Sequence, residues 1–264
     1  MKLLFSDLDG TILDFHTYSC EKSLPGISLC REHGIPLILV SSKTFDEMAD
    51  IHCRLGLDAP FVFENGGGVA WKNSSCGSGS PYELQLSGLT CEVLRERLPL
   101  LRDAAGHALT PLPDMDWEKV ADLTGLDETG ARNALKRRTS IPFIIDQGNG
   151  LLYGKLPEVN SMLQGHGLQV IQGRRFFHFT SAGVDKGAAV KKIIARYGET
   201  SGNGEILTFA AGDSFNDMPM FDAVSRSFYV GDDDVAAVKS GTVHRTEARG
   251  PAGFTEAVRG IIAV

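Results

Sequence analysis

The chain has 264 residues, of which 42% are hydrophobic and 22% are charged, and its formal net charge is -7 at pH 7. These values are typical of a globular protein with one large or two modest domains. The excess of acidic residues argues against nucleic acid or an anionic membrane as the main partner, because both attract chains rich in Lys and Arg. A phosphorylated small molecule stays compatible with this charge, since a local basic pocket can lie within an acidic shell.

The cysteines are odd in number and have no paired spacing. Reduced thiols and a cytoplasmic location are therefore expected for Cys20, Cys30, Cys53, Cys76 and Cys91, and no CxxC pair suggests zinc. No segment approaches the roughly 18 apolar residues that a membrane span needs. The chain enters a strand-like run at once, so no signal peptide is expected. The oligomeric state is left open.

The first predicted elements alternate between strands and helices. Short apolar runs indicate strands, and Thr44 with Glu47 forms a capping-box pattern at the start of a helix. In chain order we expect a strand at Lys2–Ser6, a helix at Glu21–His33, a strand at Ile35–Val40, a helix from Thr44 to about Leu55 and a strand at Phe61–Phe63. This repetition with short connections is typical of a parallel sheet with right-handed crossovers.

The alternation breaks at the polar, turn-rich segment Asn73–Pro81, which predicts a boundary or an exposed loop. The segment that follows, to Gly183, mixes helix-like and strand-like runs and is expected to be a separate α+β module. Its predicted helices are Cys91–Ala104, Asp114–Leu123 and Thr129–Arg138, and its predicted strands are Phe143–Asp146, Leu151–Lys155 and Phe176–Thr180.

After Gly183 the alternating pattern returns. We expect a helix at Lys186–Tyr197, strands at Ile206–Ala210, Phe228–Val230 and Thr242–Arg245 with a helix before the last of them, and a closing helix near Gly253–Ile262. The predicted fold class is therefore α/β, with a Rossmann-like parallel-sheet core formed by residues 1–80 and 184–264. The α+β module, residues 81–183, is inserted in the middle of this core.

Polar side chains cluster where the predicted core strands end, and ligands gather beyond the carboxyl ends of parallel strands. The clusters are Asp7 with Asp9, Ser41 with Ser42 and Lys43, Lys186, and Asp213 with Asn216 and Asp217. Any one cluster is compatible with an ordinary turn or helix cap. Together they place several carboxylates at one sheet edge, where they repel each other unless a cation holds them. Mg²⁺ suits such oxygen ligands, whereas the absence of imidazole and thiolate there disfavours zinc.

This set of residues can carry out phosphoryl transfer. Carboxylate attack on phosphorus gives an aspartyl-phosphate, a known form of covalent catalysis. The second aspartate, two residues on, points the same way if the strand pleat persists, and it can protonate the leaving alcohol. Lys186 would neutralise the nucleophile and the phosphoryl oxygens, and the hydroxyl of Ser41 would hydrogen-bond one of those oxygens.

Four segments resemble the signature motifs of the haloacid dehalogenase superfamily, in order: "DLDGT" (Asp7–Thr11), the strand ending in Ser41, "DKG" (Asp185–Gly187) and "GDSFND" (Gly212–Asp217). The inserted module resembles the C2B-type cap of that superfamily. More narrowly, "SSKTFDEM", "FENGGG", "QGRRFFHF", "GDSFNDMPMF" and "RGPAGF" resemble the mannosyl-3-phosphoglycerate phosphatases. Gln172–Gly173 departs from the two glycines usual in that family.

The resemblance implies roles for individual residues. Asp7 is implied as the nucleophile, Asp9 as the general acid/base, and Ser41 and Lys186 as holders of the phosphoryl group. Mg²⁺ is implied at Asp7, the backbone carbonyl of Asp9, Asp213 and, directly or through water, Asp217. Asn216 is expected to orient Lys186 or the phosphate.

The implied activity is phosphomonoester hydrolysis on a sugar-like small molecule, with mannosyl-3-phosphoglycerate as the first candidate. Glucosyl-3-phosphoglycerate and sucrose phosphate are alternative substrates. A phosphomannomutase-like phosphotransferase and a non-catalytic binding module are alternative functions.

Weaker signals concern substrate contacts. Strand alternation places Arg174 and His178 on one face, where they form either a clamp for a substrate carboxylate or a solvated face; Arg175 falls on the other. Asn65 and Gly66 lie in a glycine-rich turn that is either a tight turn or a backbone facing the substrate. Lys43 either begins its helix or binds substrate. The basic segment Leu135–Ser140 is interpreted as structural, because cations suit a helix C-terminus.

Overall fold

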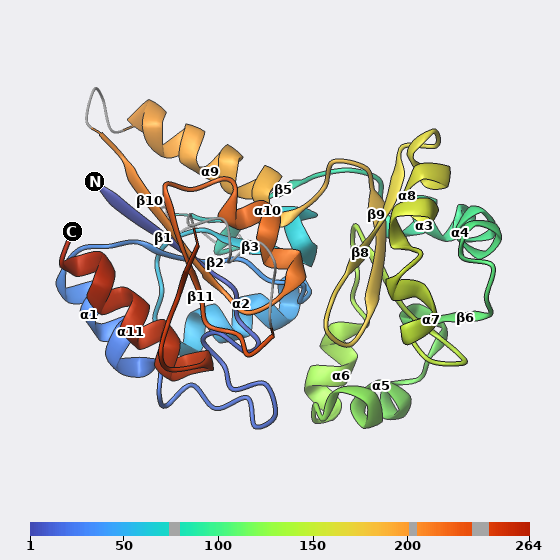
Figure 1. The fold of residues 1–264 in the computed structure, drawn as a ribbon, viewed down its shortest axis with the longest axis horizontal. Coiled ribbons are helices and arrows are strands. Elements are labelled where there is room, and N and C mark those ends of the chain that lie inside the picture. Colours follow the sequence, from blue (N-terminus) through green and yellow to red (C-terminus); the bar gives the residue numbers. More distant parts are fainter. Residues whose placement is uncertain (74–79, 201–204, 234–242) are drawn as a thin grey trace.

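The computed structural model describes residues 1–73, 80–200, 205–233 and 243–264. Its central feature is a parallel five-stranded sheet in the order β12-β11-β10-β1-β2 (Figure 1). The strands are β1 (Lys2–Ser6), β2 (Leu37–Leu39), β10 (Leu207–Gly212), β11 (Arg226–Tyr229) and β12 (Val243–Arg245). The predicted α/β class and parallel sheet are confirmed. We call the half of the molecule built on this sheet the core.

Helices cover both faces of the sheet because its strands are apolar on both sides. On one face of the sheet, Leu4 belongs to an apolar cluster with side chains of α1 (Leu24–Glu32), α2 (Phe45–Arg54) and α11 (Gly250–Ile262). Its neighbours Leu3 and Phe5 point to the opposite face, where they meet α9 (Lys186–Thr200) and α10 (Met218–Phe221). The capping box predicted at Thr44 is formed and begins α2.

An antiparallel sheet, β3-β4-β5, extends the core through a parallel bridge between Val40 and Val62. Its strands are β3 (Phe61–Phe63), β4 (Gly68–Lys72) and β5 (Tyr82–Leu86). Strand β5 pairs with β4 along its full length, so this part of the segment expected in the inserted module is hydrogen-bonded to the core. The domain limits drawn from the sequence stay a prediction.

The second half, here called the cap, is built on an antiparallel sheet in the order β6-β7-β9-β8. Its strands are β6 (Leu109–Pro111), β7 (Ile141–Ile145), β8 (Leu168–Gln172) and β9 (Phe177–Ser181). Its helices are α3 (Cys91–Glu96), α4 (Leu98–Ala105), α5 (Trp117–Thr124), α6 (Glu128–Ala134), α7 (Gly150–Tyr153) and α8 (Leu156–Gln164). In Figure 1 the cap lies beside the core, with α5 and α6 at one end of its sheet.

Some predicted cap elements are wrong. The segment predicted as a strand at Leu151–Lys155 lies in α7 and the turn after it, with Leu152 buried and Leu151 and Tyr153 exposed. Its short apolar run does not distinguish a strand from a helical turn. Strands β6 and β8 and helix α8 were not expected. The helix predicted between Val230 and Thr242 and most of the Asn73–Pro81 loop lie outside the described residues.

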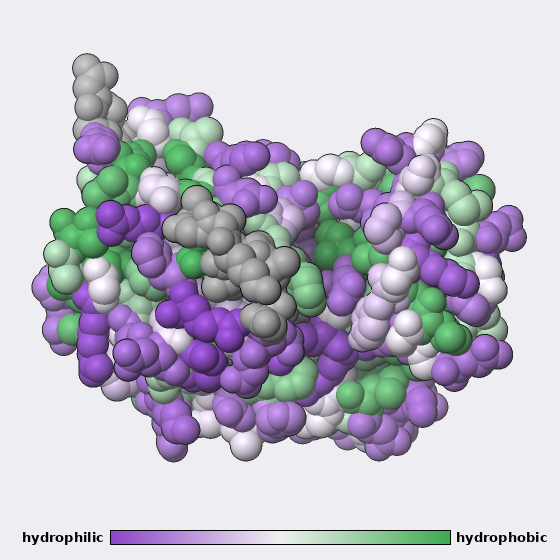
Figure 2. Space-filling model, viewed as in Figure 1, coloured by the Kyte–Doolittle hydropathy of each residue, from purple (hydrophilic) through white to green (hydrophobic). Residues whose placement is uncertain are grey.

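No helix in the described part of the chain is long and apolar enough to cross a membrane. Cys20, Cys30, Cys53 and Cys91 are free thiols, as expected, and Cys76 falls outside the described ranges. The face in Figure 2 is mostly hydrophilic, with hydrophobic side chains visible in the recess between core and cap.

Candidate active site

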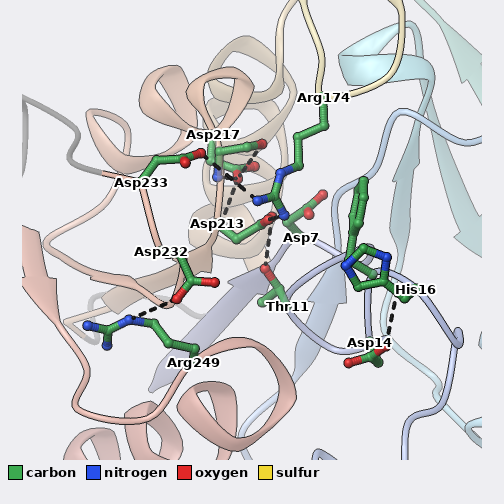
Figure 3. A network of polar contacts seen from close by, with 12 residues as sticks. Asp7, Thr11, Asp14, His16, Arg174, Asp213, Asp217, Asp232, Asp233 and Arg249 are labelled. Atoms are coloured by element: carbon green, nitrogen blue, oxygen red, sulfur yellow. Dashed lines mark hydrogen bonds and ion pairs between the residues drawn. The ribbon is translucent and has the colours of Figure 1, made fainter.

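Three carboxylates meet at the edge of the core sheet. Strands β1 and β10 are adjacent and parallel, and Asp7 and Asp213 each follow the last residue of their strand at the same edge of the sheet. Asp217 joins them from the next turn, and one oxygen from each residue lies within 4.8 Å of the other two. All three side chains are buried, and Figure 3 shows them together. The predicted convergence of these residues therefore occurs.

Lys186 partly neutralises this cluster. It is the first residue of α9 and is fully buried, with Nζ 2.5 Å from Asp7 Oδ1 and 2.6 Å from Asp217 Oδ1. No hydrogen bond or ion pair reaches Asp7 Oδ2 from the described residues. The two oxygens of Asp7 therefore differ: one is held by a cation and the other is available for chemistry.

Burial sets the proton affinities of these groups. It raises the pKa of Asp7 to about 6, with Lys186 opposing the rise and Asp217 adding to it. Burial and the neighbouring carboxylates also raise the pKa of Asp213 well above its usual value. For Lys186 burial alone lowers the pKa, but the contacts with Asp217 and Asp7 outweigh it and the net pKa is raised. The lysine is therefore a permanent cation in this site.

The loop after β10 is held by Asp217 itself. Its Oδ2 accepts the backbone N–H groups of Asp213 and Ser214, each at 3.0 Å. A Cβ at Gly212 would lie 2.6 Å from Asp217 Oδ2, so this glycine permits the close turn. Both oxygens of Asp217 are thus engaged, which favours an indirect role at a metal.

Asp9 lies apart from the three-carboxylate cluster. Its Oδ2 is 3.0 Å from Lys43 Nζ, which also lies 3.6 Å from Glu47 Oε1. Burial alone would lower the pKa of Lys43. The carboxylates of Asp9 and Glu47 outweigh this effect, so its net pKa is above the usual value. Asp9 Oδ1 is buried without a hydrogen-bond partner in the described residues. Both side chains line the pocket beside Asp7.

Ser41 is buried behind this pocket. Its Oγ accepts the backbone N–H of Lys43 at 3.3 Å, and the neighbouring Ser42 rather than Ser41 lines the pocket. Ser41 therefore organises the loop after β2, and the phosphate contact expected of it stays a prediction.

The turn Glu64–Gly66 contacts the loop after β10 and the start of α9. Asn216 Nδ2 donates to Asn65 Oδ1 at 3.1 Å. Gly66 has φ +102°, and a Cβ there would lie 2.1 Å from the carbonyl oxygen of Asp185. Gly66 thus packs against the start of α9, directly before Lys186. It does not line the pocket that contains Asp7 and Asp9.

Two cap residues predicted to bind substrate reach the site. Arg174 Nη1 donates to Asp213 Oδ2 at 2.8 Å (Figure 3). The Arg174 guanidinium also lies over the Phe15 ring. His178 is buried on β9, and burial, with smaller contributions from Arg137 and Lys186, lowers its pKa to about 3. Arg175 donates to the Tyr18 hydroxyl and, at 3.0 Å, to the Phe15 carbonyl.

The pocket between core and cap includes residues that the sequence did not indicate. Phe15 and Tyr18 form its core wall, and Arg137 lines it from the segment interpreted as structural. Its volume is about 100 Å³. A second cavity of about 1060 Å³ shares Phe15, Arg174 and Ser214 with this pocket and is also lined by Asp213.

The carboxylates fit a hard divalent cation. Asp7 and Asp213 offer oxygens only, and no His or Cys joins the metal-compatible group found among the described residues. Gly10 packs closely against this cluster, because a Cβ there would lie 2.3 Å from Asp213 Oδ2. Asp7, Asp213 and the neighbouring backbone are therefore suited to Mg²⁺, with Asp217 behind them.

Comparisons with known proteins agree with this geometry. The family model described as haloacid dehalogenase-like hydrolase matches residues 4–80 and 160–244. A glucosyl-3-phosphoglycerate/mannosyl-3-phosphoglycerate phosphatase of Persephonella marina is 32% identical over 228 residues, covering 83% of this chain and 80% of that protein.

Solved structures share the whole fold. A protein of Thermoplasma acidophilum superposes with a TM-score of 0.71 at 18% identity, covering 100% of this chain and 99% of that one. The sucrose-phosphatase of Synechocystis sp. PCC6803, solved with sucrose and phosphate, gives 0.64 at 15% identity, covering 98% and 97%. The arrangement of Asp7, Lys186, Asp213 and Asp217, taken with the family match, identifies this chain as a phosphoric monoester hydrolase that belongs to the haloacid dehalogenase-like hydrolases.

Proposed function

We propose that this enzyme is a Mg²⁺-dependent phosphatase that removes phosphate from a glycosylated 3-phosphoglycerate, through a phosphorylated Asp7. The observation that carries the proposal is the asymmetry of Asp7: Lys186 holds Oδ1 at 2.5 Å, whereas Oδ2 has no partner among the described residues. The substrate class is supported by the relative from Persephonella marina and by Arg137, a pocket cation with no acidic partner among the described residues.

In the proposed reaction, Asp7 Oδ2 attacks phosphorus while the bond from phosphorus to the sugar-side oxygen breaks. Asp9, whose Oδ1 is unpaired, gives a proton to the leaving oxygen and then takes one from the water that attacks the phosphorylated Asp7. Lys186 stabilises charge on Asp7 and the phosphoryl oxygens throughout. Mg²⁺, when bound, supplies positive charge that offsets the phosphoryl oxygens as the carboxylate approaches.

Further roles are proposed for the remaining residues. Asp7, the Asp9 carbonyl and Asp213 would hold the metal, with Asp217 acting through water. Ser41, Lys43, Asn65, Gly66 and Asn216 would shape the phosphate side of the pocket, and Arg174 and His178 the cap side. We retain residues 1–80 and 184–264 as the catalytic core and 81–183 as the cap, which would exclude bulk water once closed.

The test is phosphate release from mannosyl- and glucosyl-3-phosphoglycerate, sucrose phosphate and simple hexose phosphates, with and without Mg²⁺. The expected result is release that requires Mg²⁺, is fastest on the two glycosyl-3-phosphoglycerates and is lost in Asp7→Asn. No release from any compound by folded protein contradicts the proposal. Formation of an isomeric sugar phosphate without free phosphate indicates a mutase instead.

A further inference from the structure

Four cationic side chains line the pocket between core and cap, and they differ in the protein groups that they contact. Lys43 contacts the carboxylates of Asp9 and Glu47. Arg174 contacts Asp213 at 2.8 Å and Asp233 at 4.0 Å. These two cations are therefore compensated by negative charge inside the protein.

Arg175 is held by neutral groups of the core. It donates to the Tyr18 hydroxyl and to the Phe15 carbonyl, and its guanidinium lies over both aromatic rings, 4.4 Å from the centre of Phe15 and 5.6 Å from that of Tyr18. Both of its terminal nitrogens are used in this contact. Arg175 thus joins the cap to the loop after β1 and is poorly placed to bind substrate as well.

Arg137 also contacts only neutral groups, but among the described residues one of its terminal nitrogens has no partner. Its Nη1 donates to the Ser42 carbonyl at 2.7 Å and its Nε to the Ala134 carbonyl at 3.1 Å. Within the described part of the chain, no carboxylate oxygen lies within ion-pair distance of this guanidinium, and no hydrogen bond involves Nη2. It therefore brings an uncompensated positive charge to the pocket wall, next to the loop that carries Ser42 and Lys43.

The core fixes the backbone around Arg137. The buried carboxylate of Glu64 accepts the N–H groups of Arg138 at 2.8 Å and Thr139 at 3.0 Å, and the hydroxyl of Ser140 at 2.7 Å. A Cβ at Gly67 would lie 1.9 Å from Thr139 Oγ1, so the two segments interlock closely. Arg137 is held where the cap meets the core, directly before these bonded residues.

A second unsatisfied polar group lies on the same side of the pocket. His178 lines it and is buried, and its Nδ1 has no hydrogen-bond partner in the part of the chain described. Leu112, Val120 and Phe176 form the apolar wall beyond. A ligand with one further anionic group, placed between Arg137 and the phosphate site, would satisfy the arginine while the rest of the molecule faces that wall.

We propose that Arg137 binds the carboxylate of the substrate's glycerate and thereby makes the enzyme selective for phosphomonoesters that carry a second anionic group. This inference rests on the proposed function. A guanidinium forms charge-assisted hydrogen bonds to carboxylate oxygens, and Nη2 of Arg137 has no such bond to any described residue. A sugar phosphate with no second anionic group would leave Arg137 without a negatively charged partner in the closed pocket.

The experiment compares two substrates and four proteins. The substrates are glucosyl-3-phosphoglycerate and its analogue in which CH₂OH replaces the carboxylate. The proteins are wild type, Arg137→Met, Arg137→Lys and the matched control Arg138→Met, which removes the same charge from the adjacent residue. Arg138 lies over the Phe45 ring, outside the pocket, and only its backbone N–H contacts Glu64. Thermal unfolding monitored by circular dichroism shows that each variant is folded.

The expected result is a loss in kcat/KM of roughly 10- to 100-fold for Arg137→Met on the carboxylate substrate, mostly through KM, with little change on the analogue. Arg137→Lys should keep part of the preference, and Arg138→Met should behave as wild type on both compounds. If Arg137→Met or Arg137→Lys loses activity equally on both substrates, or Arg138→Met matches Arg137→Met, the inference is wrong. If wild type hydrolyses neither compound, the proposed function itself fails.

Discussion

The buried carboxylate of Glu64 gives a quantitative prediction about how the cap is attached to the core. Among the described residues it has no cationic partner, and it accepts the backbone N–H groups of Arg138 and Thr139 and the hydroxyls of Thr139 and Ser140. In Glu64→Ala both N–H groups lose their acceptor, and each buried unsatisfied donor costs roughly 1–3 kcal/mol. The free energy of unfolding should therefore fall by about 2–6 kcal/mol.

Glu64→Gln separates charge and hydrogen bonding from side-chain volume. With the amide oxygen facing Thr139 and Ser140, its NH₂ group meets the Arg138 N–H donor, so one bond is lost and the free energy of unfolding falls by about 1–3 kcal/mol. The control is Glu83→Gln, an exposed residue on β5. Urea unfolding measures the loss, and amide hydrogen exchange should accelerate at 138 and 139. A Glu64→Ala protein as stable as the control, with both amides still protected, would refute this reasoning.

Three further predictions concern the site. Lys186→Met leaves Asp7 and Asp217 without their buried cation. Phosphate release should disappear, and the free energy of unfolding should fall by about 3–5 kcal/mol. Unchanged stability in urea would contradict this prediction. The control Gly34→Ala introduces a Cβ that meets nothing within 4 Å, so positive φ alone should cost roughly 1–2 kcal/mol of folding free energy. Gly66→Ala should destabilise the protein by more than this, because its Cβ also meets the Asp185 carbonyl. Equal melting temperatures for the two variants would count against the tight contact. The pKa of His178 is about 3 in the folded protein, below its ordinary value of 6.5. Between pH 6.5 and 3 the imidazole is therefore protonated in the unfolded chain but not in the folded one. The free energy of unfolding of the wild type should fall as the pH drops through this range. His178→Gln should lower that slope by about 1 kcal/mol per pH unit, measured by urea unfolding at pH 4 to 6, and an unchanged slope would show that His178 is not buried in neutral form.

Local chemistry explains why much of the core was predictable. The apolar run of β1 and the capping box of α2 depend on residues close in the sequence, and both formed as expected. Because parallel strands end at a common edge, the positions of Asp7 and Asp213 followed once β1 and β10 were recognised. The family resemblance then added roles for residues that the pattern alone left open.

Contacts between core and cap were not predictable in the same way. The bonds from Glu64 to the segment at Arg138 span more than seventy positions in the sequence, and they exist only because the cap docks there. The basic segment containing Arg137 had a sufficient local explanation as a helix end, so nothing indicated its contact with Ser42. Arg174 lines the pocket and also contacts Asp213, a contact between cap and core that the sequence did not indicate.

The most direct test of the account is a crystal of the wild-type enzyme soaked with beryllofluoride and Mg²⁺. Beryllium should bond to Asp7 Oδ2, opposite the oxygen held by Lys186, and Asp7→Ala should release no phosphate from any substrate. Beryllium bonded to Asp9, Asp213 or any other residue, or hydrolysis that persists in Asp7→Ala, would contradict the assignment of Asp7 as the nucleophile.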